Sequence, residues 1–544
     1  MDAADFSYPM AVDSRRSPVM ARRGMVATSH PLAARTGLRV LEDGGNAADA
    51  AVATAAVLNV VEPGMTGIGG DCFVLSAFDG EYAGYNGSGG APAAADLAEY
   101  QERTPAAADG QPVMPQSGGL PVTVPGALDA WAALLERYGT RGLDDLLAPA
   151  VRYAREGVPV PPHVADWWAD AAPRLARFPE SRSVYLPDGR APGPGETFAN
   201  PALADTLAGI AETGPGYLYD GPLGAELVEV VRRHGGTLAV EDLRAHEGEW
   251  TEPVSTTFGG YEVLEHPPNG QGVVALAALN VARQFDLPAD PTDPDRLHHL
   301  IEAVKLAFAD GYAHVTDPDR YAVPTAAMCD PAYGAERAAE VGHRAAEYGA
   351  AAGEWAGGAG PAGEDTAYLA VVDGDGNAVS LINSVYMPFG SGLVAGGAAI
   401  QNRGHSFSLD ADHANALEPG KRPYHTIIPA LLRDADSGAL RAAWGVMGGS
   451  MQPQGHLQVL AALADGANPQ AALDAPRFRW LEGRRVAVET DRVSEGVLTA
   501  LRSRGHRVVD GDEHFFGGGQ VVYTDGERLI GGSDPRKDGH AAGF

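Results

Sequence analysis

The 544-residue sequence is poor in cysteine and has no long apolar run. Cys72 and Cys329 are its only cysteines, which is too few for a disulfide framework, and neither has the spacing of a metal-ligand pair. No window approaches the run of about 18 uncharged apolar residues that a membrane span needs. Residues 1–24 lack the apolar core of a secretion signal. We therefore expect a soluble, cytoplasmic protein that does not use a membrane.

Positive charge is also scarce. There are 71 Asp and Glu against 40 Lys and Arg, so the net charge is −31, and lysine occurs only at positions 305, 421 and 537. An acidic chain repels phosphates, which excludes nucleic acid as a partner. A GC-biased genome explains arginine in place of lysine. A salt-rich cytoplasm also explains the excess of acid, so the composition favours a halophilic organism.

The remaining composition is that of a globular protein. Hydrophobic residues make up 45% and charged residues 20%, enough for two domains or one elaborated core. Helical periodicity dominates the first two thirds, and short β-type runs dominate beyond residue 365. Helix blocks beside strand blocks predict an α+β layered sandwich. The expected helices include 31–41, 46–61, 127–138, 143–155, 201–212, 273–283 and 297–313, with a further one starting at Gln454; the expected strands include 72–76, 366–372, 378–382, 427–432 and 442–446.

The junction at Asp365-Thr366 is the most informative point of the chain. A Gly/Ala-rich linker, 350–365, ends there, and Thr366 opens a strand that a DGDGN turn joins to the next strand. If the bond before Thr366 is cut, the free α-amine, with an ordinary pKa of about 7.7–8, is a general base for the neighbouring hydroxyl. The junction can also be a plain connection between domains, and for this feature taken alone the plain connection is the better explanation.

A second feature is the pair Gly448-Gly449 between a β-type run and a helix. Adjacent glycines let backbone N–H groups approach a substrate closely, which an oxyanion hole requires. A simple strand-to-helix turn is the alternative.

Ordered motifs along nearly the whole chain resemble the γ-glutamyltranspeptidase (glutathione hydrolase) family of N-terminal-nucleophile hydrolases, in a divergent branch with cephalosporin-acylase-like members. The resemblance implies a four-layer αββα sandwich, no metal or organic cofactor, and self-cleavage between Asp365 and Thr366. Residues 1–365 would form a mostly helical large subunit and 366–544 a small subunit that stays associated with it. The motifs are GGNAADAAVATAAVLNVVEPGMTGIGGDCF (44–73), PPNGQG (267–272), DTAYLAVVDGDGNAVSLINS (365–384), NALEPGKRPYHTIIPAL (415–431), GVMGGSMQPQGH (445–456) and GGSDPRKDGHAAG (531–543).

The resemblance also implies roles for residues. Thr366 would be the nucleophile of both self-cleavage and acyl transfer, and Ser384 would orient its amine where the family has a second threonine. The amides of Gly448 and Gly449 would hold the oxyanion. Water would release the acyl group by hydrolysis, whereas an amine acceptor would receive it by transpeptidation.

Departures from the family pattern fall on the substrate side. Ser88 stands where the family has an arginine for the substrate α-carboxylate, and Ser406 stands where it has an aspartate for the α-ammonium. Each lost charge-assisted hydrogen bond is worth about 1.5–3 kcal/mol. Arg403, in the same loop as Ser406, is a candidate for another carboxylate anchor or for an ion pair with an acidic residue. Further substitutions place Tyr386, His425 and Thr426 in the expected pocket, where we expect His425 to be neutral.

These features support three hypotheses. The first is an autoprocessing γ-glutamyl hydrolase or transferase acting on small γ-glutamyl amides. The second is an amidase or acylase of cephalosporin-acylase type for a non-α-amino acyl group such as glutaryl. The third is an uncleaved structural or binding homologue without chemistry, which denaturing electrophoresis would distinguish.

Overall fold

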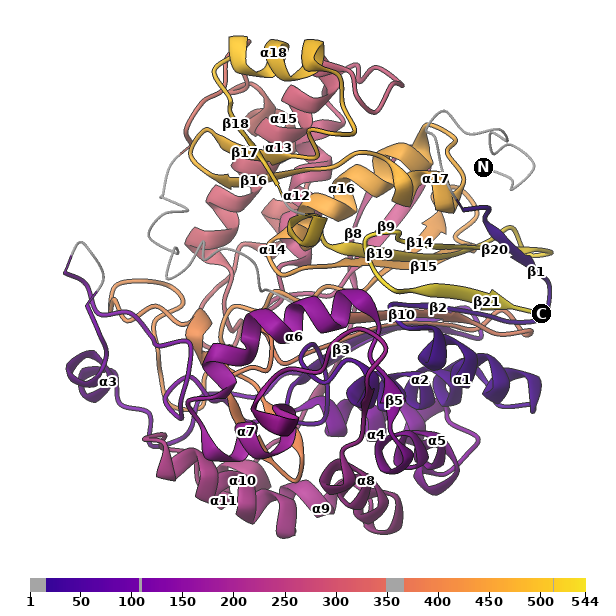
Figure 1. Ribbon diagram of the computed structural model, residues 1–544. Coiled ribbons are helices and arrows are strands. Elements are labelled where there is room, and N and C mark those ends of the chain that lie inside the picture. The colour runs from indigo at the N-terminus through magenta and orange to yellow at the C-terminus, as the bar shows by residue number, and fades with distance from the viewer. Residues whose placement is uncertain (1–15, 107–109, 349–365, 512) are drawn as a thin grey trace.

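The computed structural model describes residues 16–106, 110–348, 366–511 and 513–544. Two seven-stranded antiparallel sheets lie face to face, and helices cover the outer face of each (Figure 1). This is the αββα sandwich that the family resemblance implies, and it confirms the α+β layering expected from the sequence pattern. The linker expected at 350–365, including Asp365, lies outside the described residues. Thr366, on the other side of the expected cleavage site, is described.

Both ends of the described chain contribute strands to each sheet. The first sheet has the order β1-β20-β19-β15-β14-β9-β8, and the second has the order β21-β2-β10-β11-β3-β4-β7. Strands of the first sheet are β1 (Val19–Ala21), β8 (Val254–Phe258), β9 (Tyr261–Glu265), β14 (Ala430–Asp434), β15 (Leu440–Met447), β19 (Gly518–Thr524) and β20 (Leu529–Ser533). Those of the second are β2 (Met25–Thr28), β3 (Asp71–Phe78), β4 (Glu81–Gly87), β7 (Glu249–Thr251), β10 (Ala367–Val372), β11 (Ala378–Ser384) and β21 (His540–Gly543).

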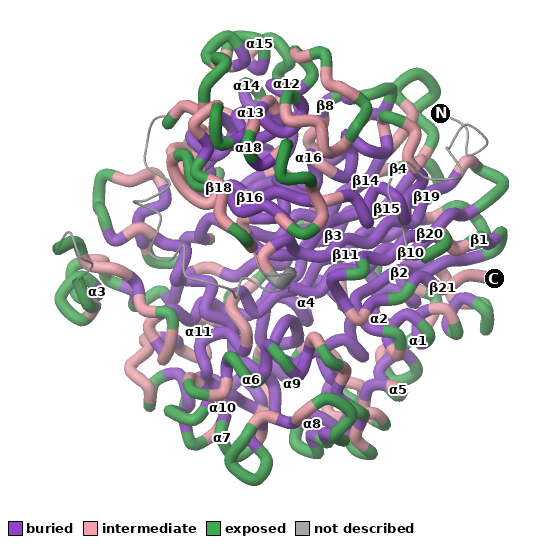
Figure 2. Tube along the Cα trace, turned by 45° about the horizontal axis from the view of Figure 1, so that its top comes forward, coloured by how far each residue is buried: buried purple, intermediate pink, exposed green. Residues whose placement is uncertain are grey.

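Two sets of helices form the outer layers. Helices α1 (Pro31–Glu42), α2 (Ala47–Val61) and α4 (Ala127–Tyr138) pack on the second sheet. Helix α5 (Leu143–Glu156) packs on α2, and α8 (Pro201–Thr213) packs on α5. Helices α12 (Gly272–Ala282) and α16 (Met451–Ala464) pack on the first sheet. Helix α13 (Pro294–His314) packs on α12, and α18 (Glu495–Ser503) packs on α13. Figure 2 shows both sheets buried over most of their length, with exposure concentrated in the outer helices and loops.

Shorter elements surround this frame. Additional helices are α3 (Leu97–Arg103), α6 (Pro162–Leu175), α7 (Pro179–Tyr185), α9 (Gly216–Tyr219), α10 (Pro222–Arg233), α11 (Val240–Arg244), α14 (Thr325–Cys329), α15 (Pro331–Ala338) and α17 (Pro469–Asp474), with 3-10 turns η2 (Pro187–Gly189), η3 (Arg403–Ser406) and η4 (Glu513–Phe516). Small sheets pair β5 (Val158–Pro159) with β6 (Thr197–Phe198), β12 (Leu393–Ala395) with β13 (Ala398–Ile400), and β16 (Phe478–Glu482) and β18 (Arg507–Asp510) with β17 (Arg485–Val488).

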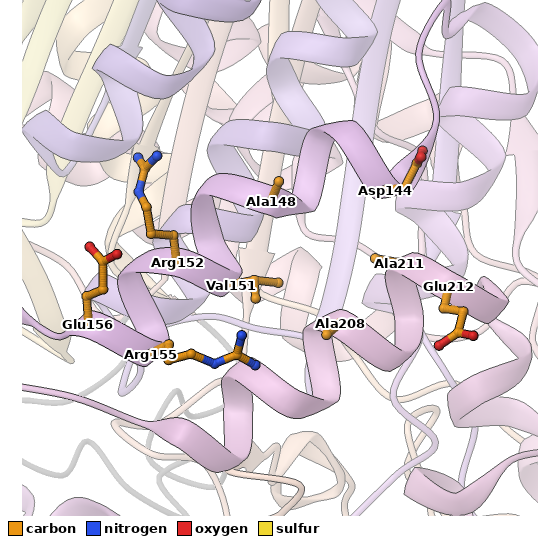
Figure 3. Close-up of a pocket in the computed structure, with 9 residues that line it drawn as sticks. All are labelled: Asp144, Ala148, Val151, Arg152, Arg155, Glu156, Ala208, Ala211 and Glu212. Atoms are coloured by element: carbon orange, nitrogen blue, oxygen red, sulfur yellow. The ribbon is translucent and has the colours of Figure 1, made fainter.

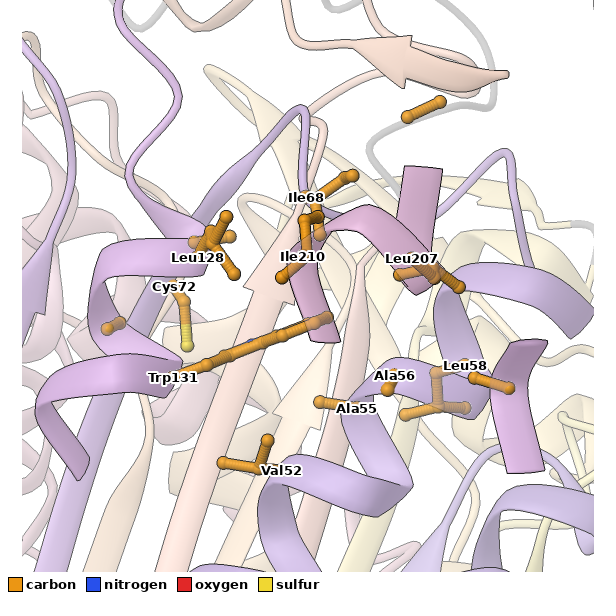
Figure 4. Close-up of a cluster of buried hydrophobic side chains, with 14 of the residues drawn as sticks. Val52, Ala55, Ala56, Leu58, Ile68, Cys72, Leu128, Trp131, Leu207 and Ile210 are labelled. Carbon is orange, nitrogen blue, oxygen red and sulfur yellow. The ribbon is translucent and has the colours of Figure 1, made fainter. Parts of the chain in front are cut away.

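Helix α2 shows how composition positions an element. Its sequence AADAAVATAAVLNVV is apolar nearly all round, and every residue of it is buried. Asn46 caps it by accepting hydrogen bonds from the amides of Ala48 and Asp49. Figure 4 shows Val52, Ala55 and Leu58 of this helix in one apolar cluster with Trp131 of α4. A helix of small residues lets the strands beneath it pack closely.

Two boundaries and one hairpin differ from the sequence prediction. The strand expected from 427 begins only at Ala430, because Pro429 has no amide hydrogen and the amides of Ile427 and Ile428 donate to the side chains of His425 and Gln452. The helix expected from Gln454 begins at Met451, since Pro453 fits the first turn, where no amide donor is needed. The sequence analysis also omits the hairpin of β8 and β9, although its Gly259-Gly260 turn, with φ of +57° and +85°, is a local hairpin signal.

All three lysines are buried: Lys305, Lys421 and Lys537 are 2%, 1% and 2% exposed. Among the described residues, no helix combines the length and the apolar character that crossing a bilayer requires.

Candidate active site

Four polar side chains form a row across the end of the second sheet. The strand pairing places Ser384 of β11 opposite Asp71 of β3, and one further step along the same pairing places Thr366 beside Ser384 and Ser88 beside Asp71. The alternation of side chains in a strand points this row toward the first sheet, because Tyr368, Ile382 and Phe73 lie on the same face and pack between the sheets. The row is therefore enclosed between the two layers.

Thr366 and Ser384 are in direct contact. The Oγ1 hydroxyl of Thr366 donates a hydrogen bond of 3.2 Å to Oγ of Ser384. The amide of Tyr386 donates to the same oxygen at 2.9 Å. Thr366 is only 2% exposed. The predicted nucleophile and the hydroxyl predicted to orient it thus lie together at the start of β10 and the end of β11.

Asp71 is a member of the row that the sequence analysis did not single out. Its Oδ1 accepts hydrogen bonds from the amides of Gly89 and Gly126 at 3.3 and 3.2 Å and from Nε2 of Gln401 at 2.9 Å. Burial raises the pKa of this carboxyl to about 7, against the lowering effect of the Arg403 charge and of these donors. An aspartate directly after Gly69-Gly70 at a strand start is the signal that could have identified it.

His425 contacts Asp71 from the opposite layer. Its Nδ1 accepts from the amide of Ile427 at 3.3 Å, so the proton resides on Nε2, which lies 3.0 Å from Oδ2 of Asp71. Burial, with the nearby charge of Arg403, holds the pKa of His425 well below its usual value. These are the contacts of a neutral imidazole, as the sequence analysis expects. The pair connects the two sheets at the row.

Arg403, Thr426 and Tyr386, all predicted pocket residues, come together above the row. Nη1 of Arg403 donates to Oγ1 of Thr426 at 2.9 Å, and its guanidinium carbon lies 4.2 Å from the centre of the Tyr386 ring. Arg403 is fully buried. Tyr386 has φ +78°, a left-handed backbone that is strained for an aromatic residue and is often found at functional sites.

The two serines at substituted clamp positions belong to different segments. Ser88 ends the row, and its hydroxyl donates to Oδ1 of Asn86 at 2.7 Å. Ser406 lies in the 3-10 turn that begins with Arg403, is 2% exposed, and accepts from Asn415 at its carbonyl. Neither hydroxyl carries a charge, so this pair cannot form the electrostatic clamp for an α-amino acid that the family pattern would have there.

The Gly448-Gly449 loop follows the strand that crosses β10. Gly445 of β15 packs directly on the Tyr368 ring, where a Cβ would lie 2.7 Å from a ring carbon. Gly448 and Gly449 have φ of +122° and +54°, which glycine adopts without strain. Nε2 of Gln271 donates to the carbonyls of both Gly449 and Thr426, at 2.9 and 2.6 Å. Gln271 thereby joins the predicted oxyanion loop to the residue that contacts Arg403.

Among the described residues, the buried trio His298, Glu302 and His506 could offer metal-ligand atoms close together. The Nζ of Lys305 already donates to Oε1 of Glu302 at 2.6 Å, and His298 Nδ1 lies 2.8 Å from His506 Nε2. An internal ammonium therefore balances the carboxylate, and the two imidazoles contact each other, so all three side chains already have partners within the protein.

Two open grooves lie away from Thr366. One, of about 470 Å³, runs between α5 and α8 (Figure 3) and mixes Val151 and alanines with charges of both signs, such as Arg155 and Glu212. The other, of about 520 Å³, reaches Ser88 and is lined by Asp317, Glu249 and Arg422 among others. Neither groove has Thr366 or Ser384 among its lining residues.

Comparison with known proteins gives consistent matches over the whole chain. A sequence model described as Gamma-glutamyltranspeptidase matches residues 33–544. The Glutathione hydrolase-like YwrD proenzyme of Bacillus subtilis is 38% identical over 97% of this chain and 99% of its own length. The Oxamate amidohydrolase proenzyme of Klebsiella pneumoniae is 34% identical over 96% of this chain and 98% of its own length. The crystal structure of cephalosporin acylase from Bacillus halodurans has a TM-score of 0.90 and 45% identity, covering 99% of this chain and 98% of that chain.

Proposed function

This chain belongs to the gamma-glutamyltranspeptidase family, and we propose that it is an autoprocessing amidohydrolase that uses Thr366 as its N-terminal nucleophile. The single observation that carries the proposal is the contact of Thr366 Oγ1 with Ser384 Oγ at the end of a buried row. The relatives that match over their full length are named as proenzymes, which supports cleavage into two associated subunits. The subunits would be residues 1–365 and 366–544.

The chemistry needs only groups of this chain. Scission before Thr366 frees its α-amine, which accepts the proton of Oγ1 as the oxygen attacks the substrate amide carbonyl. The amides of Gly448 and Gly449 stabilise the oxyanion. The proton passes to the leaving amine as the C–N bond breaks, and an acyl ester remains on Thr366. Water then attacks this ester to release the acid, or an amine acceptor takes the acyl group. Ser384 holds the nucleophile in position throughout.

The geometry best supports an acyl group that carries a carboxylate but no α-ammonium. Arg403, fully buried beside the row and fixed between Tyr386 and Thr426, supplies the positive charge of the pocket. A guanidinium suits a carboxylate because it presents paired donors in a plane. Asp71, the carboxylate of the row, already accepts hydrogen bonds at both oxygens, so it is a poor partner for a substrate ammonium. Glutaryl amides and similar short diacid amides fit this description.

A γ-glutamyl donor is the second candidate, because the relative from Bacillus subtilis is named glutathione hydrolase-like. A γ-glutamyl group equals a glutaryl group with an added α-ammonium, so Arg403 could bind the carboxylate of either. The two functions differ only in how the pocket treats the extra positive charge.

The test compares glutaryl-p-nitroanilide with γ-glutamyl-p-nitroanilide on the purified, processed protein. Turnover of the first with little turnover of the second supports the acylase function, and the reverse supports the γ-glutamyl function. Intact mass spectrometry during turnover should show the acyl group on the subunit that begins with Thr366. Neither turnover nor an acyl adduct with any donor, in a protein that remains one chain, would contradict the proposal.

A further inference from the structure

The buried row holds a carboxylate that the proposed chemistry does not use. Asp71 stands next to Ser384 in the row, and Ser384 contacts Thr366. Neighbouring side chains on paired strands have Cβ atoms about 4.5–5.5 Å apart, so a charge at Asp71 lies close to the reacting end of the sheet. A buried charge is costly unless an opposite charge or hydrogen bonds compensate it. This position therefore matters for what the pocket can bind.

Two connections link Asp71 to the Arg403 group. Gln401 donates to Oδ1 of Asp71, and Arg403 follows two residues later at the start of the 3-10 turn. His425 contacts Oδ2 of Asp71, and Thr426, the next residue, accepts from Arg403. The Asp71 carboxylate thus contacts the two segments that position the Arg403 guanidinium, one through Gln401 and the other through His425. The charges of Asp71 and Arg403 act on each other in a region that excludes water.

We propose that Asp71 is the counter-charge of Arg403 in the empty pocket, and that it takes up a proton when a substrate carboxylate binds to Arg403. Asp71 is then a positioning and specificity-determining residue for the acyl donor. This role rests on the proposed function of Arg403 as a carboxylate anchor. An incoming carboxylate offsets the attraction between Arg403 and Asp71 and adds a second negative charge nearby. Protonation of Asp71 leaves one carboxylate for one guanidinium.

The other titratable groups around Asp71 keep their protonation state. Burial holds the pKa of His266 at about 4 and that of His425 well below its usual value. Burial also raises the pKa of the Cys72 thiol and of the Tyr219 phenol well above their usual values. Arginine stays protonated throughout. Burial raises the pKa of the Asp71 carboxyl to about 7. In the processed protein this carboxyl and the Thr366 α-amine are therefore the groups of the row that titrate near neutral pH, and the D71N variant distinguishes them.

Carboxylate binding at Arg403 and proton uptake by Asp71 favour each other. A bound carboxylate raises the pKa of Asp71 further, so the complex holds more protons than the free protein between the two pKa values. Affinity for a carboxylate ligand is therefore highest below about pH 7 and falls as the pH rises. A rise of one pKa unit corresponds to about a tenfold weaker Kd on the alkaline side.

The experiment uses glutarate as the probe and the processed wild-type protein. Isothermal titration calorimetry at pH 7.5, in buffers of low and high ionisation enthalpy, should show uptake of about half a proton per glutarate bound. The Kd should weaken about tenfold from pH 6 to pH 9. D71N should bind glutarate without proton uptake and with a nearly constant Kd. E81Q, an acid-to-amide change at an exposed position of β4, should behave as wild type.

The outcomes separate the two proposals. Glutarate that binds wild-type protein without proton uptake overturns the linkage and leaves the proposed function standing. Uptake that persists in D71N assigns the proton to another group, such as the Thr366 α-amine, and also overturns it. If glutarate does not bind wild-type protein at any pH, the role of Arg403 as carboxylate anchor and the linkage to Asp71 are both overturned, whereas the turnover and acyl-adduct tests still decide the role of Thr366. The wild-type measurement decides the question even if D71N does not fold.

Discussion

The molecule buries arginine in two very different ways. Arg536 is 3% exposed, and its Nε and Nη2 donate to the two carboxylate oxygens of Glu489 at 2.7 and 2.6 Å. Its Nη1 also reaches Asp534 at 3.1 Å, and that carboxylate pairs with Arg477 at 2.6 Å. Arg403 is fully buried as well, and its contacts include the Thr426 hydroxyl and the Tyr386 ring.

The difference shows that a buried arginine can serve either the stability of the fold or the binding of a ligand, depending on the groups around it. Around Arg536, bidentate carboxylates neutralise the charge where it stands, and their attraction raises the pKa of the guanidinium despite its burial. Such a cluster ties together the end of α17, the region after β17 and the segment after β20. Around Arg403, a neutral hydroxyl and an aromatic face orient the charge beside the row of Thr366. The first arrangement stabilises the fold, and the second suits an anionic ligand.

Removal of the nucleophile should have the largest effect. It tests whether the reaction takes place at Thr366, on which the assignment of Arg403 to the reacting site depends. Thr366→Ala deletes the attacking hydroxyl, so processing should stop, and turnover of any amide donor should fall by at least about 10⁴-fold. Denaturing electrophoresis should show a single chain where wild-type protein shows two. Thr366→Ser keeps a hydroxyl and should still be processed. A two-band, active Thr366→Ala protein would remove the basis for assigning Arg403 to a reaction site.

Loss of Arg536 should cost stability more than chemistry. Arg536→Met leaves the buried carboxylates of Glu489 and Asp534 with one fewer cation, and the expected loss is about 3–5 kcal/mol in the free energy of unfolding. Urea unfolding followed by tryptophan fluorescence measures it. Arg190→Met, at an exposed ion pair with Glu196, should unfold like wild type. An Arg536→Met protein of unchanged stability would erase the contrast between the two arginines.

Loss of Arg403 should cost affinity more than stability. Arg403→Met removes charge-assisted hydrogen bonds to the donor carboxylate worth about 1.5–3 kcal/mol, so kcat/KM on glutaryl-p-nitroanilide should fall about 10- to 150-fold. The loss should appear mainly in KM, while a neutral butyryl donor should lose little. Equal losses on charged and neutral donors would mean that Arg403 supports the fold instead of reading the substrate.

The smallest change tests the row itself. Ser384→Ala removes the hydroxyl that contacts Thr366, and one neutral hydrogen bond is worth about 1 kcal/mol. We expect kcat to fall several-fold with KM nearly unchanged, measured on the same donor. Ser384→Thr keeps the hydroxyl and should retain most activity. A normal kcat in Ser384→Ala would show that the row positions the nucleophile without this contact.

The sequence predicted much of the fold and the elements that carry the proposed chemistry. Helix α2 and the hairpin of β10 and β11 follow from local apolar periodicity and a tight turn, so their positions were predictable. Strand pairing between segments far apart in the chain, such as that of β9 with β14, was not. Asp71 was missed for the same reason. Its partners Gln401 and His425 lie 330 and 354 residues away along the chain.

Local sequence alone determined the α+β layering, the glycine loop at 448–449 and a hydroxyl residue at the start of a strand, because each depends on neighbours a few residues apart. The tertiary structure decided which polar groups share one buried row. It also decided that Arg536 pairs with the carboxylate of Glu489, whereas Arg403 donates to the hydroxyl of Thr426. Those outcomes depend on strand register and on the meeting of two sheets, where a shift of one residue would turn every side chain to the opposite face.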